Sequence, residues 1–551
     1  MESPGLTAEM TLEEQLGQVV VVGFTGTQVT PEVADLIARQ RVGGIILFSR
    51  NVADTQQVLA LTRDLQAVAR AAGQRYPLLI AIDQENGVVR RLGRGATIFP
   101  GNMALAATGS EQLVYDVALA TGRELKALGI NLNLAPVVDV NNNPNNPVIG
   151  VRSFGEDTHA VARLGVAAAR GYRAAGVIGC LKHFPGHGDT VVDSHAGVPT
   201  VPVDLQRLES VELVPFRAGI AAGAASVMVG HIAFSHLTTH PTLPASISPE
   251  IVHDLLRERL GFGGVIASDC LEMGAIADTV GTERGAVMAL RAGIHLMLVS
   301  HRYDRQTGAL AAIADAVRAG ELPAGAARQA AERVLAMKAR DLSWDLLTPP
   351  VAEWVGGAAH RQLAAQAYAL AVTLVRDDAA LLPLRLRPDE RLLVLDPSGE
   401  AGTPAEEQRG AEGWLAASCA RRHGRVDALP LSLRPTAGER EQVAQRAAGA
   451  DLIIVATKNA HLHPEQAEVV RRLVQTGRRV IGVAVHNPYD LVAFPELRTY
   501  VVTYEYTPPV MEAAARVLWG EVTPQGRLPV ALPGLYPRGH GADMGRSAGG
   551  A

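Results

Sequence analysis

The sequence predicts an α/β protein in which a (β/α)8 barrel of the TIM type is followed by a C-terminal α/β sandwich domain. Two observations carry the prediction of a barrel. Short apolar runs alternate eight times with stretches of helical periodicity over about 330 residues, as in a parallel sheet covered on its faces. Polar residues then follow many of these runs. A third observation predicts a second domain: the alternation of apolar runs and helical stretches starts again after Pro349 and Pro350.

The eight apolar runs are the predicted strands of the barrel. The stretches between most of them have helical spacing, and the first connection is shorter. A doubly wound sheet is the alternative, but it binds its ligand at one switch point, whereas a barrel assembles its site from many strand ends. Polar residues at many strand ends therefore favour the barrel. The runs are residues 19–24, 43–48, 78–83, 132–140, 179–184, 226–232, 264–269 and 295–300.

The predicted domains are a barrel over residues 1–345, a linker over 346–357 and the second domain over 358–537. In the second domain, apolar runs at 371–376, 391–396, 451–457, 480–486 and 498–504 are the predicted strands. The small, polar segment 538–551 is predicted to be a disordered tail.

Composition excludes several classes of protein. The chain has 551 residues, of which 48% are hydrophobic and only 4% aromatic, which favours helix-rich α/β packing. The net charge of −5 and the lack of a basic stripe argue against nucleic acid as a partner. No run of 18 apolar residues and no signal-peptide pattern occurs, so we expect a cytoplasmic protein that does not contact a membrane. The three widely spaced cysteines predict neither a disulfide framework nor a zinc ribbon.

One segment, "KHFPGHGDTVVDSH" at residues 182–195, concentrates titratable groups. It follows the fifth predicted strand, and its proline and glycines break that strand, so it should lie at the top of the barrel. A polar loop closed by its own side chains is one interpretation. A metal site is another, because His183, His187, Asp193 and His195 are possible ligands.

Proton transfer is the third interpretation of this segment. Asp193 and His195 are two residues apart, so the carboxylate can orient the imidazole as a general acid or base. Such a pair needs a partner nucleophile. Asp269, at the end of the seventh predicted strand, is the candidate, although a carboxylate there can also be the N-cap of the next helix. A carboxylate with an acid/base group is the minimum for retaining glycoside hydrolysis.

The "KHFPGHGDTVVDSH" and "SDCLEMGAI" segments resemble family 3 glycoside hydrolases, in particular their β-N-acetylglucosaminidase branch. The stretches "GGIILFSRN", "DQENGVVRRL", "FPGNMAL", "LNLAPVVDV" and "VIGVRSFGED" match in order. The second domain resembles the family's α/β sandwich through "HNPYDL" and "YEYTPPVMEAAARVLWGEVTPQGRLPV". One departure lies at Glu85-Asn86-Gly87-Val88, where the family commonly has Glu-Gly-Gly-Arg. Because Asn tolerates a left-handed backbone, we expect the turn to persist.

The resemblance implies roles for individual residues. Asp269 stands at the position of the nucleophile, His195 at that of the acid/base and Asp193 at that of its orienting carboxylate. Glu505 or Glu512 of the second domain could be the acid/base instead, but the complete loop motif favours His195. The branch works without a metal or cofactor. The residues at positions that bind the terminal N-acetylglucosamine are Asp83, Arg91, Arg152, Lys182 and His183.

The resemblance thus predicts an exo-acting, retaining enzyme that releases terminal N-acetylglucosamine from small oligosaccharides. A peptidoglycan fragment is the expected substrate, and chitin oligosaccharides are the alternative. Some proteins of this branch resemble phosphorylases, so inorganic phosphate is an alternative acceptor to water. A catalytically inactive sugar-binding protein and a metal-dependent barrel hydrolase are further alternatives. The sequence does not distinguish a monomer from a homodimer, and the second domain is expected to support the barrel or a dimer contact.

Overall fold

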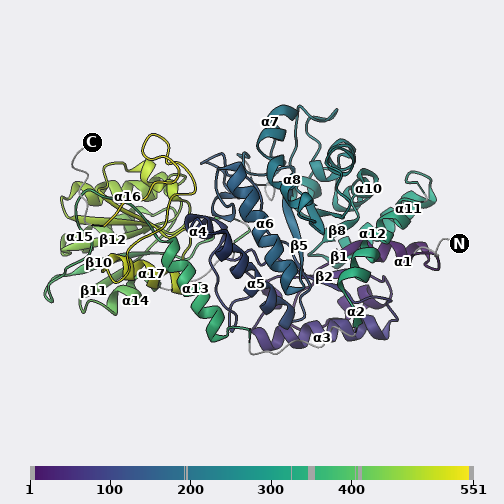
Figure 1. The fold of residues 1–551 in the computed structure, drawn as a ribbon, viewed down its shortest axis with the longest axis horizontal. Coiled ribbons are helices and arrows are strands. Elements are labelled where there is room, and N and C mark those ends of the chain that lie inside the picture. Colours follow the sequence, from purple (N-terminus) through teal and green to yellow (C-terminus); the bar gives the residue numbers. More distant parts are fainter. Residues whose placement is uncertain are drawn as a thin grey trace.

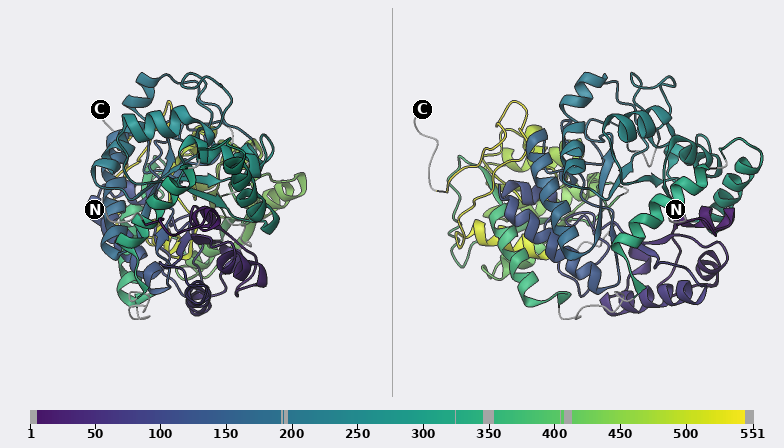
Figure 2. Two further views of the ribbon diagram at one scale, coloured as in Figure 1. Left: turned by 90° about the vertical axis from the view of Figure 1, so that its right-hand side faces the viewer. Right: turned by 45° about the vertical axis from the view of Figure 1, so that its right-hand side comes forward.

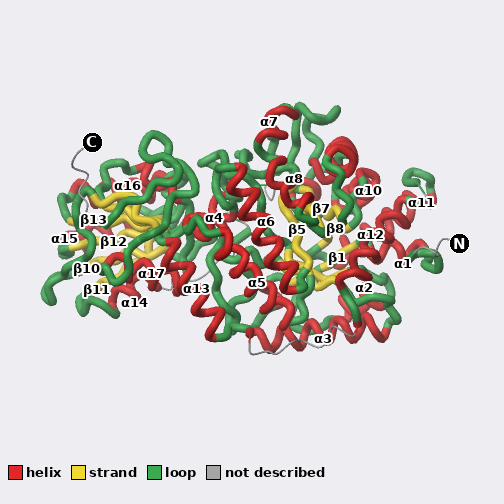
Figure 3. Tube along the Cα trace, in the orientation of Figure 1, coloured by secondary structure: helices red, strands yellow, loops and turns green. Residues whose placement is uncertain are grey.

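The computed structural model describes residues 6–191, 193, 197–323, 325–344, 354–403, 405–406 and 413–544. Two lobes lie side by side along the longest axis of the molecule, the barrel with the first described residues and the second domain with the last ones (Figures 1 and 2). The strands form two separate groups, one in each lobe (Figure 3). The predicted fold class, a barrel followed by an α/β sandwich, is confirmed.

The first lobe is a closed barrel in which the strands lie in sequence order and every pair of neighbours is parallel. The barrel closes where β1 pairs with β8, with Val21 opposite Leu298. All eight predicted runs contain a strand: β1 (Val20–Val22), β2 (Gly44–Leu47), β3 (Leu79–Ile82), β4 (Leu132–Asn133), β5 (Ile178–Phe184), β6 (Ser226–Val229), β7 (Val265–Cys270) and β8 (Leu296–Val299).

Strand β4 is much shorter than the predicted run 132–140. Pro136 has no backbone N–H and cannot donate to a neighbouring strand, so the regular ladder stops before it. Beyond the proline, Val137 forms an isolated bridge to Lys182 of β5. The rest of the run is buried loop, and it brings Asp139 to the top of the barrel.

Helices surround the barrel, and several begin at side-chain caps. The Thr11–Glu14 spacing predicts a capping box, and both of its hydrogen bonds are present. The helices of this lobe are α1 (Leu12–Gln18), α2 (Pro31–Ala38), α3 (Thr55–Ala71), α4 (Asn102–Ala107), α5 (Glu111–Ala127), α6 (Thr158–Ala175), α7 (Leu205–Ser210), α8 (Leu213–Ala221), η4 (Glu250–Arg259), α9 (Gly274–Ala277), α10 (Thr282–Ala292), α11 (Tyr303–Arg318) and α12 (Ala326–Asp341), with short turns at η1 (Ser49–Asn51), η2 (Gly150–Arg152) and η3 (Ala245–Ile247).

The second lobe is a six-stranded sheet in the order β11-β10-β12-β13-β14-β9, with only β9 antiparallel to its neighbour. Side chains alternate along β10, so Leu392 and Val394 pack into one core and Leu393 and Leu395 into another. Its elements are β9 (Thr373–Asp377), β10 (Leu392–Pro397), β11 (Val426–Leu431), β12 (Leu452–Thr457), β13 (Arg479–Ala484), β14 (Thr499–Val502), α13 (Ala358–Ala371), α14 (Trp414–Ala420), α15 (Ala437–Ala448), α16 (Pro464–Gln475), η7 (Pro488–Ala493) and α17 (Pro508–Leu518).

The predicted domain boundaries stay predictions. The predicted linker lies largely in residues 345–353, outside the described part of the chain. Residues 538–544 lie within the predicted tail and still contact the second lobe, where the Ala542 amide donates to the Leu374 carbonyl at 2.7 Å. Among the described helices, none combines the length and apolarity needed to cross a bilayer. The three cysteines are buried and unpaired.

Candidate active site

A pocket of about 380 Å³ opens at the top of the barrel, where the carboxyl ends of the strands converge. Its wall combines charged and polar side chains with an apolar part that includes Phe48, Met228 and Met273. The five predicted sugar-binding residues, which come from β5 and from the segments that follow β3 and β4, line it together with Asp269 of β7. The titratable residues in the wall are Asp83, Glu85, Asp269 and Glu406, Arg50, Arg91, Arg152 and Lys182, and His183, His187 and His301.

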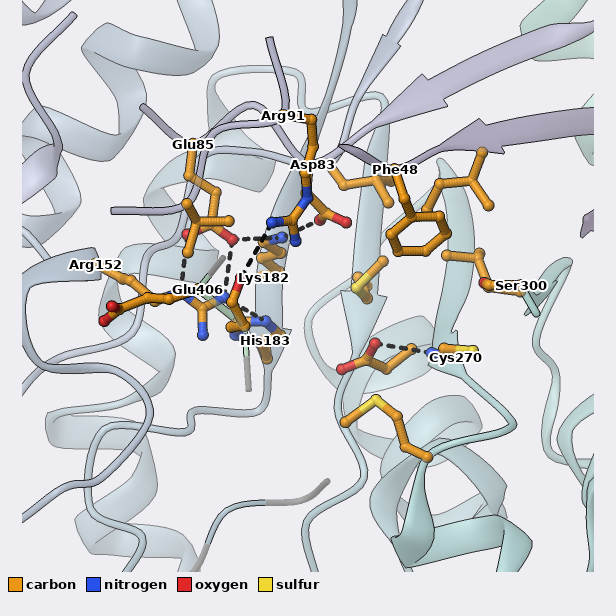
Figure 4. A pocket seen from close by; sticks show the side chains of 18 of the residues that line it. Phe48, Asp83, Glu85, Arg91, Arg152, Lys182, His183, Cys270, Ser300 and Glu406 are labelled. Atoms are coloured by element: carbon orange, nitrogen blue, oxygen red, sulfur yellow. Dashed lines mark hydrogen bonds and ion pairs between the residues drawn. The ribbon is translucent and has the colours of Figure 1, made fainter. Parts of the chain in front are cut away.

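Glu85 is the centre of a buried ion-pair network on one side of this pocket (Figure 4). Arg152 donates to both of its carboxylate oxygens at 2.8 Å, and Lys182 Nζ lies 2.7 Å from Oε1. Lys182 also contacts Asp83 Oδ1 at 2.7 Å. Two carboxylates and two cations thus neutralise one another. Arg152 is buried and Arg91 is half-buried, so neither arginine of the predicted site is a solvated surface residue.

The charges in this network reinforce one another. Burial by itself would raise the pKa of Glu85, but the charges and hydrogen bonds of Arg152 and Lys182 lower it far below its ordinary value. Burial would likewise lower the pKa of Lys182, but Asp83 and Glu85 raise it. The pocket therefore presents fixed charges whose hydrogen-bonding groups are positioned before a ligand arrives.

Asp139 fixes the first part of the histidine-rich loop. Its carboxylate accepts hydrogen bonds from the backbone amides of His183 and His187 and lies 2.8 Å from His183 Nδ1. Because Arg152 Nη2 lies 3.4 Å from His183 Nε2, His183 is best described as the tautomer with its proton on Nδ1. Burial lowers the pKa of His187 to about 4, so this imidazole is neutral.

The departure at residues 85–88 preserves the turn, as expected. Asn86 and Gly87 both have left-handed backbones, with φ of 70° and 58°. The Val89 amide donates to the Asn86 carbonyl, and the Glu85 amide donates to the Val89 carbonyl. This turn sets Glu85 toward the network while Arg91 reaches the pocket from the following residues.

Asp269 is half-buried at the end of β7 and faces the pocket. Its Oδ1 accepts the Cys270 amide at 2.8 Å. The alternative role as a helix cap is wrong, because α9 begins at Gly274 and its N-cap is Met273. Cys270 lies across the pocket from Glu85 and Arg152 (Figure 4), and Asp269, the residue before it, lines the same pocket.

Of the predicted acid/base pair, the structure describes only one residue. Asp193 is described and half-buried, but His195 lies outside the described residues. The Asp193–His195 contact and the distance from His195 to Asp269 therefore stay predictions. Within the described part of the chain, no three His, Cys, Asp or Glu side chains are placed to hold a metal ion.

Comparison with known proteins identifies the family. Residues 11–337 match the glycosyl hydrolase family 3 N terminal domain, and residues 372–538 match the family's C-terminal domain. The chain belongs to glycosyl hydrolase family 3. It is a glycoside hydrolase, and its curated relatives include proteins named β-hexosaminidase.

Three known proteins show how far the likeness extends. β-Hexosaminidase A of Pseudoalteromonas piscicida is 33% identical, with 92% of each chain covered. The structure of a family 3 β-N-acetylglucosaminidase from Paenibacillus sp. str. FPU-7 is 39% identical with a TM-score of 0.89, covering 95% of this chain and 99% of that one. A solved β-glucoside phosphorylase, at 22% identity and a TM-score of 0.81 with 95% of each chain covered, shares the fold alone.

The two alternative acids of the second domain of this family 3 chain do not line the pocket. Glu505 is buried and accepts hydrogen bonds from the Gly101 amide at 3.0 Å and the Tyr368 hydroxyl at 3.1 Å. Glu512 pairs with Arg421 and Arg422. Glu505 is therefore a contact between the two domains, and Glu512 is the partner of exposed Arg421 and of largely buried Arg422.

Burial of Glu505 predicts how the stability of the folded chain depends on pH. Burial raises its pKa from 4.5 to about 7, so the folded chain binds this proton more tightly than the unfolded chain. The stability of the folded chain should therefore fall as pH rises from about 4.5 to about 7 and then level off. Above pH 7, Glu505→Gln should increase the free energy of unfolding by an amount of the order of 3 kcal/mol, which raises the melting temperature. This gain should shrink as the pH falls toward 4.5.

Thermal unfolding between pH 5 and 8.5 measures this effect, and Glu512→Gln is the matched control. Although burial would raise the pKa of Glu512, its two arginines lower it, so the control should lose stability at neutral pH. A Glu505→Gln curve that follows the parent at every pH would contradict the prediction.

Two residues of the network escaped the sequence prediction of the site. Glu85 is the shared partner of Arg152 and Lys182, and Asp139 holds His183. The sequence could have indicated both, because each is a carboxylate near the end of a predicted barrel strand. Glu406, which enters the pocket from the second domain, had no comparable signal.

Proposed function

We propose that this chain is a retaining, exo-acting β-N-acetylglucosaminidase that releases terminal N-acetylglucosamine through a covalent glycosyl-aspartate intermediate. The observation that carries the proposal is one pocket that is lined both by Asp269 and by a neutralised network of hydrogen-bonding charges. The full-length likeness to proteins named β-hexosaminidase and β-N-acetylglucosaminidase supports the choice of sugar.

The network suits the hydroxyl groups of one terminal sugar. Asp83 and Lys182 are linked to each other, and Lys182, Arg152 and His183 follow along the same wall. A buried hydroxyl without a hydrogen-bond partner costs about 1–3 kcal/mol, so fixed donors and acceptors favour a sugar that matches them. The apolar side chains of Phe48, Met228 and Met273 provide contact for the less polar faces of the ring and its acetyl group.

In the proposed first step, the Asp269 carboxylate attacks the anomeric carbon while the glycosidic C–O bond breaks. Protonated His195, oriented by Asp193, donates its proton to the leaving oxygen. In the second step, neutral His195 takes a proton from the acceptor, whose oxygen attacks the same carbon and releases Asp269. Two inversions retain the β-configuration. The preferred leaving group is a muramic acid unit of a peptidoglycan fragment, with a chitin oligosaccharide as its competitor.

Product analysis tests the acceptor and the substrate together. The chain is incubated with an N-acetylglucosaminyl-β-muramic acid fragment and with chitobiose, each with and without inorganic phosphate. We expect N-acetylglucosamine from both, faster from the muramic acid fragment, and unchanged by phosphate. N-Acetylglucosamine 1-phosphate as the main product would identify a phosphorylase instead. If neither N-acetylglucosamine nor its 1-phosphate formed from either substrate, the proposed function would be refuted.

A further inference from the structure

The carboxyl edge of the second domain's sheet meets the barrel pocket at Glu406. This residue follows β10, while Lys458 and His486 follow the neighbouring strands β12 and β13. Lys458 Nζ and the Gly402 amide donate to Glu406 Oε2 at 2.7 and 3.0 Å, and His486 Nε2 lies 2.5 Å from Oε1. Three donors from three strand ends thus hold one carboxylate of the second domain.

The Glu406 carboxylate and its donors form a buried, charged anchor. The Glu406 side chain is only 5% exposed. Burial by itself would raise its pKa, but the charges and hydrogen bonds of Lys458 and His486 lower it well below its ordinary value. Lys458 Nζ also donates to the Glu400 carbonyl at 2.8 Å, which ties the start of the same segment to the same cation. A buried ion pair with this many hydrogen bonds fixes the backbone that carries it.

The backbone fixed in this way contacts a barrel residue of the pocket. Ala405 precedes Glu406, and its carbonyl accepts a hydrogen bond from Arg91 Nη1 at 3.1 Å. The other end of Arg91 is held by the barrel, because its backbone amide donates to Gln84 Oε1 at 2.9 Å. Ala405, Glu406 and Arg91 all line the pocket, and Figure 4 labels Glu406 and Arg91 among its lining residues.

We propose that Glu406 is a positioning residue, which acts through the Ala405 carbonyl to orient the Arg91 guanidinium toward the terminal sugar. The inference rests on the proposed function, in which Arg91 binds that sugar. It assigns the second domain a part in substrate binding in addition to its packing against the barrel. The domains are also joined at points outside the pocket, such as the Arg538–Asp157 ion pair, so Glu406 is not needed simply to hold them together.

Steady-state kinetics with an aryl N-acetyl-β-glucosaminide tests the inference through Glu406→Ala and the milder Glu406→Gln. A remote sugar contact is made in both the ground state and the transition state, so its loss raises KM more than it lowers kcat. We expect Glu406→Ala to lower kcat/KM by about 10- to 100-fold, mainly through KM, because a charge-assisted hydrogen bond is misaligned. Glu406→Gln should show a smaller change of the same kind.

A double-mutant cycle decides whether Glu406 acts through Arg91. In the Arg91→Met background, Glu406→Ala should have no further effect on KM. Arg538→Gln is the matched control, because it removes an ion pair between the domains away from the pocket and should leave KM unchanged. The inference would be overturned if the effects of Arg91→Met and Glu406→Ala on KM multiplied in the double mutant, or if the control changed KM as much as Glu406→Ala does. It would also be overturned if the parent were active and Glu406→Ala had the same KM as the parent. A parent inactive on both natural substrates would refute the proposed function and this inference with it.

Discussion

Asp269→Ala should lower kcat on an activated aryl N-acetyl-β-glucosaminide by about 10⁴-fold or more, since loss of a nucleophile removes the covalent step. Asp269 faces the pocket from the end of β7, and its described hydrogen bond comes from the neighbouring Cys270 amide. The side chain is only half-buried, so its removal should change the melting temperature little. Initial-rate assays and thermal unfolding separate the two effects.

Chemical rescue makes the assignment more specific. The shortened side chain leaves room for a small anion on the face from which Asp269 is proposed to attack. Added azide should restore part of the rate and yield a glycosyl azide of α-configuration, because only one inversion then takes place. Asp278→Asn, at an exposed position just beyond α9, is the control and should behave like the parent. Activity of Asp269→Ala within tenfold of the parent would show that another residue is the nucleophile.

The barrel could be predicted from the sequence because its strands are buried on both sides and so are nearly continuous in apolar residues. The same reasoning missed β11 of the second domain. This strand lies at the edge of the sheet, its three residues before Leu429 are exposed or half-exposed, and it contains Pro430. An edge strand needs neither continuous apolarity nor a full set of amide donors, so its pattern is weak.

The active site likewise has a part that could be predicted from the sequence and a part that could not. Residues at strand ends, such as Asp83, Lys182 and Asp269, could be placed at the barrel top because the fold dictates where a strand ends. The partner that each charge takes could not be predicted. Glu85 and Arg152 are 67 residues apart, and Ala405 lies 314 residues from Arg91. Such contacts depend on how loops and domains pack, and no local spacing in the sequence encodes them.

Glu85→Gln should destabilise the folded chain at neutral pH by about 3–5 kcal/mol, the cost of breaking a buried ion pair from one side. Arg152 would lose the carboxylate that accepts from its Nε and Nη2, and Lys182 would keep only Asp83 as a carboxylate partner. Both cations belong to the proposed sugar-binding wall, so kcat/KM should also fall by about 100-fold or more from misplacement of these groups. Urea unfolding and kinetics at pH 7 measure the two effects.

The pH dependence of this loss tests its electrostatic origin. Because Arg152 and Lys182 lower the pKa of Glu85 from its ordinary value of 4.5, the stability that Glu85 contributes is fully present above pH 4.5 and declines as pH falls below it. The gap between parent and Glu85→Gln should therefore be constant near neutrality and narrow in acid. Glu111→Gln is the control, because Glu111 is 53% exposed in its pair with Arg163 and should contribute at most about 1 kcal/mol. If Glu85→Gln changed stability no more than this control, the buried network would contribute nothing beyond an ordinary surface pair, and the fixed charges on which the sugar-binding proposal depends would lose their support.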